Sequence, residues 1–196
     1  MMLSARLEPY RLILASHSPR RRRLLADCGL RYVLAPTYEV DEQYPPELPV
    51  REVAPFLARL KSDSYPEPLA ANDILLTADT VVILNERILG KPRDRADAAA
   101  MLRSLSGNTH TVCTGVVLRS ATHRRCFAVL TNVGFRALSE EEIDYYLDHF
   151  APYDKAGAYG IQEWIGFAAV ERIEGSFYNV MGLPIEQLYV ELEKFI

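Results

Sequence analysis

The stretch Leu12–Leu25, which reads LILASHSPRRRRLL, decides how the chain begins to fold. Its apolar run Leu12–Ala15 has the length and the flanking residues of a buried strand. Pro19 suits the first position of a helix, because the N–H that proline lacks would be unpaired there, and Ser18 then becomes the N-cap. This order of strand, polar turn and helix predicts a binding site for a phosphate or another polyanion. Unpaired backbone N–H groups and the positive end of the helix dipole meet at such a turn.

Four consecutive arginines, Arg20–Arg23, follow the turn. Arg20 and Arg21 would add fixed charge and forked donors to an anion site. The same run could be a solvated helix face or a patch for nucleic acid. Basic charge at a helix N-terminus opposes the dipole and costs stability unless an anion sits there, which favours the anion site. The net charge of −4 argues against a general nucleic-acid binder.

The composition is that of an ordinary soluble protein, with 49% hydrophobic and 24% charged residues over 196 positions. This length allows one large domain or two lobes that share a core. Three cysteines without a CxxC pair favour a reduced, cytoplasmic setting over a disulfide framework. We expect neither an N-terminal signal nor a membrane span, because no apolar run is long enough.

Strand and helix patterns alternate along the chain. Strands are predicted over 12–15, 32–35, 74–78 with its continuation 81–84, 88–89, 111–118, 125–135 and 166–170, and helices over 19–29, 50–65, 94–105, 139–150 and from 184 onward. Such a mixture predicts an α/β or α+β domain.

Two charged residues lie at the ends of predicted strands. Asp79 follows a strongly apolar strand, where a rigid scaffold commonly presents a catalytic carboxylate, although a turn-forming aspartate is the more common role. Lys91 stands in a Gly-Lys-Pro sequence and could contact phosphate, although a solvated loop lysine is the more common interpretation. Neither residue identifies an activity by itself.

The segment 154–162, DKAGAYGIQ, is a candidate ligand loop. Its small residues allow the backbone to approach a ligand closely, while Lys155 offers a charge and Gln162 an amide that can read a base edge with two hydrogen bonds. A flexible surface turn is the alternative, but alanine, tyrosine and isoleucine are poor choices for it. Walker and dinucleotide-binding fingerprints do not occur, and Tyr145 and Tyr146 fit a core or an interface better than a base-stacking platform.

Taken together and in order, seven segments resemble the Maf family of nucleotide pyrophosphatases. They are LASHSPRRRRLL at 14–25, VDE at 40–42, ARLKS at 58–62, TADTVVILNERILGKPRD at 77–94, MLRSLSGNTHTVCTG at 101–115, DKAGAYGIQ at 154–162 and IEGSFYNVMGLP at 173–184. The resemblance covers nearly the whole chain. It implies one domain over 1–196 with an elongated, two-lobed α/β fold like that of inosine triphosphate pyrophosphatases, a central mixed sheet and a cleft between the lobes. Family members are often dimeric, so a homodimer is expected.

The resemblance also implies a reaction, in which a nucleoside triphosphate is split into the monophosphate and pyrophosphate with Mg²⁺ or Mn²⁺. Arg20, Thr80 and Gln162 match the specificity positions of the subgroup that resembles dTTP/UTP pyrophosphatases, and Asp79 matches the proton acceptor. Glu163 stands where a glycine is common, and this departure could alter the breadth of pyrimidine substrates. The implied roles are clearing of the nucleotide pool and cell-division arrest; a non-catalytic nucleotide-binding regulator of septum formation is the alternative.

Within that resemblance, a mechanism assigns the remaining residues. The polar turn Ser16–Ser18 would donate hydrogen bonds to the triphosphate, and cationic side chains would surround it: Arg20, Arg21, Lys61, Lys91 and Lys155. A divalent ion would join the phosphates to Glu42 and Asp79, since hard oxygen ligands suit Mg²⁺. One shared hollow is expected to be lined by Arg20, Lys61, Asp79, Lys91 and Gln162.

Overall fold

The computed structural model describes residues 2–196, which form one mixed sheet of seven strands with flanking helices. The strands are β1 (Arg11–Leu14), β2 (Val33–Leu34), β3 (Asp73–Leu84), β4 (Arg87–Leu89), β5 (Thr109–Arg119), β6 (Arg124–Phe135) and β7 (Val170–Glu174). The helices are α1 (Leu3–Arg6), α2 (Pro19–Asp27), α3 (Val50–Asp63), α4 (Arg95–Leu105), α5 (Glu140–Phe150), α6 (Trp164–Ala168), α7 (Phe177–Val180) and α8 (Ile185–Phe195), with a 3₁₀ turn η1 (Ala156–Ala158).

The strand order is β2-β1-β3-β5-β6-β7, with β4 paired to β3. β1 runs parallel to β2 and β3, whereas β4 is antiparallel to β3 and β7 is antiparallel to β6. The predicted α/β class with a central mixed sheet is therefore confirmed. No helix within residues 2–196 has the length and apolarity that a bilayer span needs.

The chain packs as two compact units. Unit 1 comprises Met1–Asp79, Thr114–Val129 and Gly182–Ile196, and unit 2 comprises Thr80–Cys113 and Leu130–Met181. The division falls inside β3, directly after Asp79. A cleft between two lobes stays a prediction.

In unit 1, an ion pair fixes the register of the two parallel strands β1 and β3. Arg11 donates to both carboxylate oxygens of Asp73, at 2.8 and 2.7 Å, and these two residues are register partners. These hydrogen bonds hold the pKa of the buried Asp73 carboxyl below its usual range. The parallel pairing of β1 with β3 ends at Leu14 and Leu76, and the turn Ser16–Ser18 and Asp79 lie just beyond it. The prediction that Asp79 follows a strand is wrong, because β3 continues through Asp79 to Leu84.

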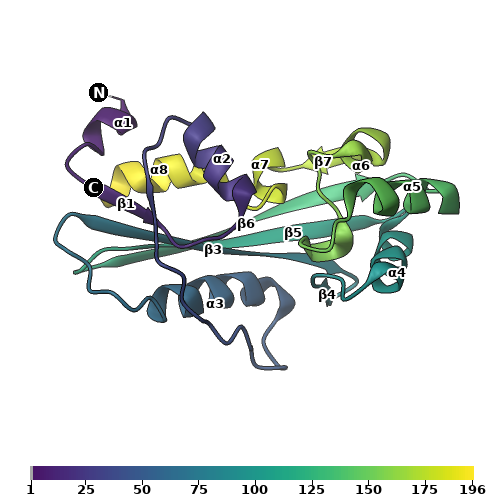
Figure 1. The fold of residues 1–196 in the computed structure, drawn as a ribbon, viewed down its shortest axis with the longest axis horizontal. Coiled ribbons are helices and arrows are strands. Elements are labelled where there is room, and N and C mark those ends of the chain that lie inside the picture. The colour runs from purple at the N-terminus through teal and green to yellow at the C-terminus, as the bar shows by residue number, and fades with distance from the viewer. Residues whose placement is uncertain (1) are drawn as a thin grey trace. The chain divides into compact units, whose positions relative to one another are not determined.

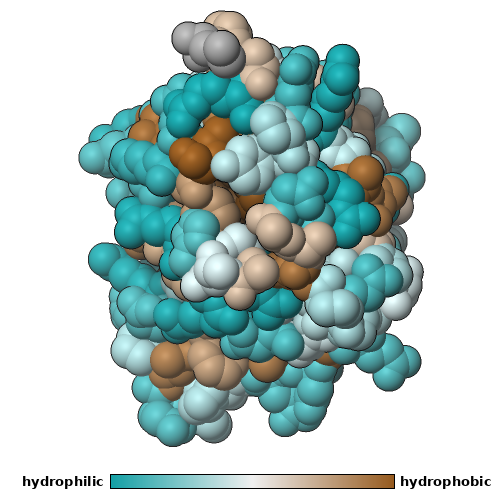
Figure 2. All heavy atoms as spheres, turned by 90° about the vertical axis from the view of Figure 1, so that its left-hand side faces the viewer, coloured by the Kyte–Doolittle hydropathy of each residue, from teal (hydrophilic) through white to brown (hydrophobic). Residues whose placement is uncertain are grey.

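Helix α3 lies on one side of the unit 1 strands, and α2 and α8 lie on the other (Figure 1). The approach of α3 to β5 is so close that a Cβ on Gly115 would lie 2.4 Å from the Pro55 nitrogen. The Thr77 hydroxyl on β3 donates to the Ala58 carbonyl of α3 at 2.7 Å. These contacts fix the end of α3 that carries Lys61. Figure 2 shows a face on which hydrophilic residues predominate and hydrophobic ones form small groups.

Unit 2 has its own core, in which α4 packs on α5 and η1. Leu102, Phe135 and Tyr146 are among its fully buried side chains. The strand predicted over 166–170 is wrong, because this segment forms α6 and the strand begins at Val170. A Cβ on Gly166 would lie 1.7 Å from the Ile161 carbonyl oxygen, so the helix is packed at a distance that only glycine permits. A short apolar run does not distinguish helix from strand, which explains the error.

Candidate active site

The N-terminus of α2 has the predicted form. Pro19 is its first residue, Ser18 is the N-cap, and the Ser18 hydroxyl accepts from the Arg21 backbone N–H at 3.5 Å. The predicted order of strand, polar turn and helix is thus confirmed at the carboxyl end of β1.

Arg21 joins the turn to the neighbouring chain segments. Its Nε donates to the Gly182 carbonyl at 2.7 Å, and its Nη1 donates to the Ala78 carbonyl at 2.9 Å and the Ser16 hydroxyl at 3.2 Å. Burial lowers the pKa of this guanidinium, while attraction to Asp79 opposes the shift. Arg21 is therefore a fixed positive charge, oriented by three acceptors of unit 1.

The other arginines of the run have different surroundings. Arg20 is partly buried. Arg22 is also partly buried, and its Nε hydrogen-bonds to no partner within residues 2–196. Arg23 is exposed and pairs with Asp27 at 3.3 Å, one helical turn later. The solvated-face interpretation thus fits Arg23, whereas Arg21 faces inward.

Lys61 on α3 contacts two carboxylates. Its Nζ lies 2.6 Å from Oδ1 of Asp79 and 3.0 Å from Oε2 of Glu42. The side chains of Lys61 and Asp79 are only 17% and 12% exposed, so solvent screens this pair weakly. Thr77 and Asp79 are two residues apart on β3, so both side chains point to the α3 face. The structure therefore brings the predicted base, one predicted cation and one predicted metal ligand together.

Glu42 and Asp79 are also the residues that were expected to bind a divalent ion. No group of three or more histidine, cysteine, aspartate or glutamate side chains suited to a metal occurs in the described part of the chain. Mg²⁺ needs only one or two protein carboxylates when substrate phosphates and water supply its other ligands. Glu42 and Asp79, which share Lys61, fit an ion that arrives with a phosphorylated substrate.

In unit 2, the predicted ligand loop is tied to the segment that carries Lys91. The Gly157 N–H donates to the Gly90 carbonyl at 3.0 Å. Gly157 has φ of +69°, and a Cβ there would lie 3.0 Å from Val82, so both conformation and space favour glycine. Lys91 follows directly and is exposed. The structure thus places Lys91 beside the loop.

Lys155, predicted to bind substrate, is paired inside unit 2. Its Nζ lies 2.7 Å from Asp154 and 3.1 Å from Oε1 of Glu163, with 10% of its side chain exposed. Its charge therefore balances the acidic side chains around the loop. A direct contact of Lys155 with substrate stays a prediction.

Two further residues, Tyr146 and Glu163, belong to the surroundings of Gln162, although only Glu163 was expected to affect the substrate. Tyr146 is core, as expected, but its hydroxyl also donates to Oε2 of Glu163. Gln162 donates from Nε2 to Oε1 of Glu163 at 3.4 Å. The signal for Glu163 was already in the sequence, because a carboxylate replaces the glycine that the resemblance leads one to expect.

The candidate residues thus fall into two groups, each assembled within one unit. The reaction group in unit 1 consists of Ser16, Ser18, Arg20, Arg21, Glu42, Lys61 and Asp79, and the recognition group in unit 2 consists of Lys91, Lys155, Gln162 and Glu163. Thr80 is the residue of β3 that follows Asp79 and is partly buried. Convergence of both groups on one ligand stays a prediction.

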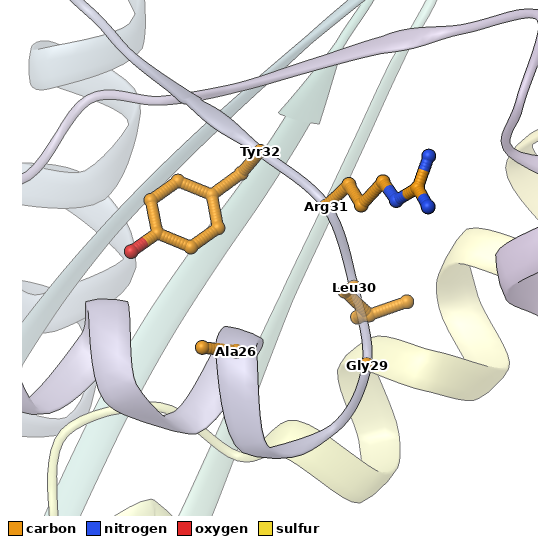
Figure 3. Close-up of a pocket in the computed structure, with 5 residues that line it drawn as sticks. All are labelled: Ala26, Gly29, Leu30, Arg31 and Tyr32. Carbon is orange, nitrogen blue, oxygen red and sulfur yellow. The ribbon is translucent and has the colours of Figure 1, made fainter.

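A hollow of about 570 Å³ lies at the C-terminal end of α2, and none of the candidate residues lines it. It is lined by Ala26, Gly29, Leu30, Arg31 and Tyr32 (Figure 3). Figure 3 shows the side chains of Arg31 and Tyr32 extending in opposite directions from the chain. Polar groups therefore do not converge there, and we assign it no chemistry.

Comparison with known proteins adds a second line of observation. The family model described as Maf-like protein matches residues 11–195. The dTTP/UTP pyrophosphatase of Bacteroides fragilis is 50% identical over 190 residues, which are 97% of this chain and 98% of that protein. The dTTP/UTP pyrophosphatase of Porphyromonas gingivalis is 50% identical over 191 residues, covering 96% of each. Among solved structures, a HAM1 protein from Coxiella burnetii matches 94% of this chain and 99% of its own, at 14% identity and a TM-score of 0.45.

Proposed function

Because this chain belongs to the Maf family, we propose that it is a nucleoside triphosphate pyrophosphatase acting on dTTP and UTP. The relatives that are about half identical over nearly the whole chain carry that activity in their names. The observation that carries the proposal is the contact of Asp79 with Lys61 at 2.6 Å, beside the polar turn and Arg21. A carboxylate held among cations can serve a reaction on an anionic substrate.

The cations account for binding of the triphosphate. A nucleoside triphosphate brings roughly four negative charges, and charge builds on the leaving pyrophosphate in the transition state. Arg21 is oriented by its three acceptors, so its reorganisation cost during the reaction is small. We assign the phosphates to Ser16, Ser18, Arg20, Arg21, Lys61, Lys91 and Lys155.

Asp79 is assigned as the proton acceptor. Within residues 2–196 its hydrogen-bond partner is Lys61, through Oδ1, so Oδ2 can accept a proton from water. The oxygen of that water attacks the α-phosphorus, the bond from this phosphorus to the pyrophosphate oxygen breaks, and the water proton passes to Asp79. The products are the nucleoside monophosphate and pyrophosphate.

We assign Glu42 and Asp79 to a divalent cation, Mg²⁺ or Mn²⁺. When bound, such an ion neutralises charge on the phosphate oxygens. Metal binding makes a carboxylate a weaker base, so the two assignments of Asp79 compete. Lys61, which lies between the two carboxylates, keeps them together before substrate arrives.

We assign recognition of the substrate's nucleobase to Gln162, with Arg20 and Thr80. The Gln162 amide offers one acceptor and two donors, enough for a bidentate contact with a pyrimidine edge. We propose further that the protein acts in the cytoplasm as a homodimer, removing nucleotides from the pool, with a role in cell-division arrest.

A panel of nucleoside triphosphates tests the proposal. Purified protein with Mg²⁺ is incubated with dTTP, UTP, dCTP, dATP and dGTP, and monophosphate and pyrophosphate are quantified. We expect equal amounts of both products, with dTTP and UTP as the preferred substrates. Tight binding of dTTP without turnover would instead identify a nucleotide-binding regulator, and release of orthophosphate would indicate another reaction.

A further inference from the structure

Glu163 is the centre of a hydrogen-bonded network in unit 2. Its Oε2 accepts from the Tyr146 hydroxyl, and its Oε1 lies 3.1 Å from Lys155 Nζ and accepts from Gln162 Nε2 at 3.4 Å. Only 18% of the Glu163 side chain is exposed. Burial, and next the hydrogen bond to Glu163, raise the pKa of Tyr146, so this phenol keeps its proton and donates. Both oxygens of the Glu163 carboxylate therefore have partners, Oε2 in Tyr146 and Oε1 in Lys155 and Gln162.

Gly160 provides the space in which this network lies. Its N–H donates to the Tyr146 hydroxyl oxygen at 3.0 Å. A Cβ at this position would lie 2.8 Å from Gln162 Nε2 and 2.9 Å from Glu163 Cδ. The amide and the carboxylate therefore rest directly on the Gly160 backbone, where a methyl group would displace them.

The network determines which way the Gln162 amide points. An ionised carboxylate only accepts hydrogen bonds, so the amide nitrogen must face Glu163. The reverse orientation would bring two acceptors together. In the observed orientation Gln162 Oε1 is buried and accepts no hydrogen bond from residues 2–196. A buried acceptor without a donor is costly, and an N–H donor on a ligand would remove that cost.

We propose that Glu163 is a positioning residue that holds the Gln162 amide in one orientation and so selects an imide edge over a cytosine edge. This inference rests on the proposed function, because it presupposes a pyrimidine nucleotide as the ligand. Uracil and thymine carry an N3–H donor next to a carbonyl acceptor, whereas cytosine carries an N3 acceptor next to an amino donor. The fixed amide, with Oε1 toward N3 and Nε2 toward the carbonyl, matches the first order and opposes the second.

Two substitutions test the role of the carboxylate. Glu163→Gln keeps the shape but can donate as well as accept, so the Gln162 amide is free to turn. Gly160→Ala retains both side chains but displaces the amide and the carboxylate from their observed positions. We expect each to reduce the ratio of kcat/KM for dTTP to that for dCTP roughly ten- to a hundred-fold, the range of one bidentate amide–base pair. Glu163→Asp, which retains an acceptor-only group, should restore part of the preference.

The control is Glu171→Gln, which removes an exposed carboxylate from β7 of the same unit and should keep the wild-type ratio. The inference is overturned if folded Glu163→Gln and Gly160→Ala proteins both keep the wild-type ratio, or if the wild type cleaves dTTP and dCTP equally well. These results differ from failure of the proposed function, in which the wild type releases pyrophosphate from no triphosphate. If Glu163→Gln does not fold, as judged by circular dichroism, Gly160→Ala decides alone.

Discussion

The reaction group and the recognition group hold their key side chains by opposite means. In unit 1, regular elements carry the charges directly: Asp79 lies within strand β3 and Lys61 extends from helix α3. In unit 2, an irregular loop carries the neutral amide of Gln162, and the partly buried carboxylate of Glu163 accepts a hydrogen bond from that amide. The difference teaches that the same fold can keep its reaction fixed while the choice of substrate varies, since loops accept change more readily than packed elements.

Apart from substitution of Asp79 itself, the largest effect is expected from Lys61→Met. Loss of the ammonium removes the partner of Asp79 and one of the cations assigned to the phosphates. The rate constant kcat for dTTP should fall roughly 10²–10³-fold, as for loss of one preorganised electrostatic contact. The ratio of dTTP to dCTP turnover should stay the same, because the recognition group is untouched.

A matched substitution is Lys194→Met in α8, which removes a lysine that is 64% exposed from the same unit. It should keep the wild-type kcat. A changed substrate ratio in Lys61→Met would show that the two groups are not separable in this way.

Acid should destabilise unit 2 through His110. This buried imidazole contacts the Tyr159 hydroxyl at 2.7 Å, and burial lowers its pKa to about 4 from 6.5. The unfolded chain therefore binds a proton below pH 6.5 that the folded chain binds only near pH 4. The contribution of the neutral His110 to the free energy of unfolding is fully present above pH 6.5. It is lost as the pH falls from 6.5 toward 4, and the loss amounts to about 3 kcal/mol.

Urea unfolding at pH 7.5, 6 and 4.5 measures this slope. His110→Gln should flatten the dependence on pH, whereas His123→Gln, at an exposed position, should leave it unchanged. An equal slope in wild type and His110→Gln would assign the acid sensitivity to other groups.

Gln162→Ala should change the choice of substrate more than the rate. Without the amide, the ratio of kcat/KM for dTTP to that for dCTP should fall roughly ten-fold or more, because one bidentate reading is lost. The fall in kcat for dTTP should be smaller than that of Lys61→Met. Steady-state kinetics with dTTP and dCTP measures both effects. An unchanged ratio of kcat/KM would show that Gln162 does not select the nucleobase.

Gly115→Ala should cause a smaller change and confine it to unit 1. The added methyl group would lie 2.4 Å from the Pro55 nitrogen, so α3 must move away from β5. Such overpacking costs about 1–3 kcal/mol in free energy of unfolding. Because α3 carries Lys61, kcat should fall as well, with the substrate ratio kept. Thermal unfolding and kinetics of this variant test whether the reaction group depends on the packing of α3.

Much of the fold could be predicted from local pattern. The N-terminus of α2 followed from Pro19 and Ser18, and most of β3 from its two apolar runs, although the strand continues through Asp79 and Thr80 between them. The stretch 164–174 was misread, because the close approach of Gly166 to Ile161 is a tertiary contact that no local pattern reports.

The site was predictable in its residue types but not in its pairings. Asp79 and Lys61 were both named from sequence, yet their direct contact depends on how α3 packs against β3. The burial of Lys155 against Glu163 could not be predicted either. Without knowledge of its partner, a charged residue in a loop is expected to be solvated. Long-range pairing is the information that the sequence pattern lacks.

The substitution Asp79→Asn tests the central claim most directly. It keeps the size of the side chain and its place beside Lys61, but removes the group that accepts the proton. Pyrophosphate release from dTTP should fall on the order of 10²–10⁴-fold while the circular dichroism spectrum and the melting temperature stay close to those of the wild type. Release at the wild-type rate from a folded Asp79→Asn protein would contradict the account.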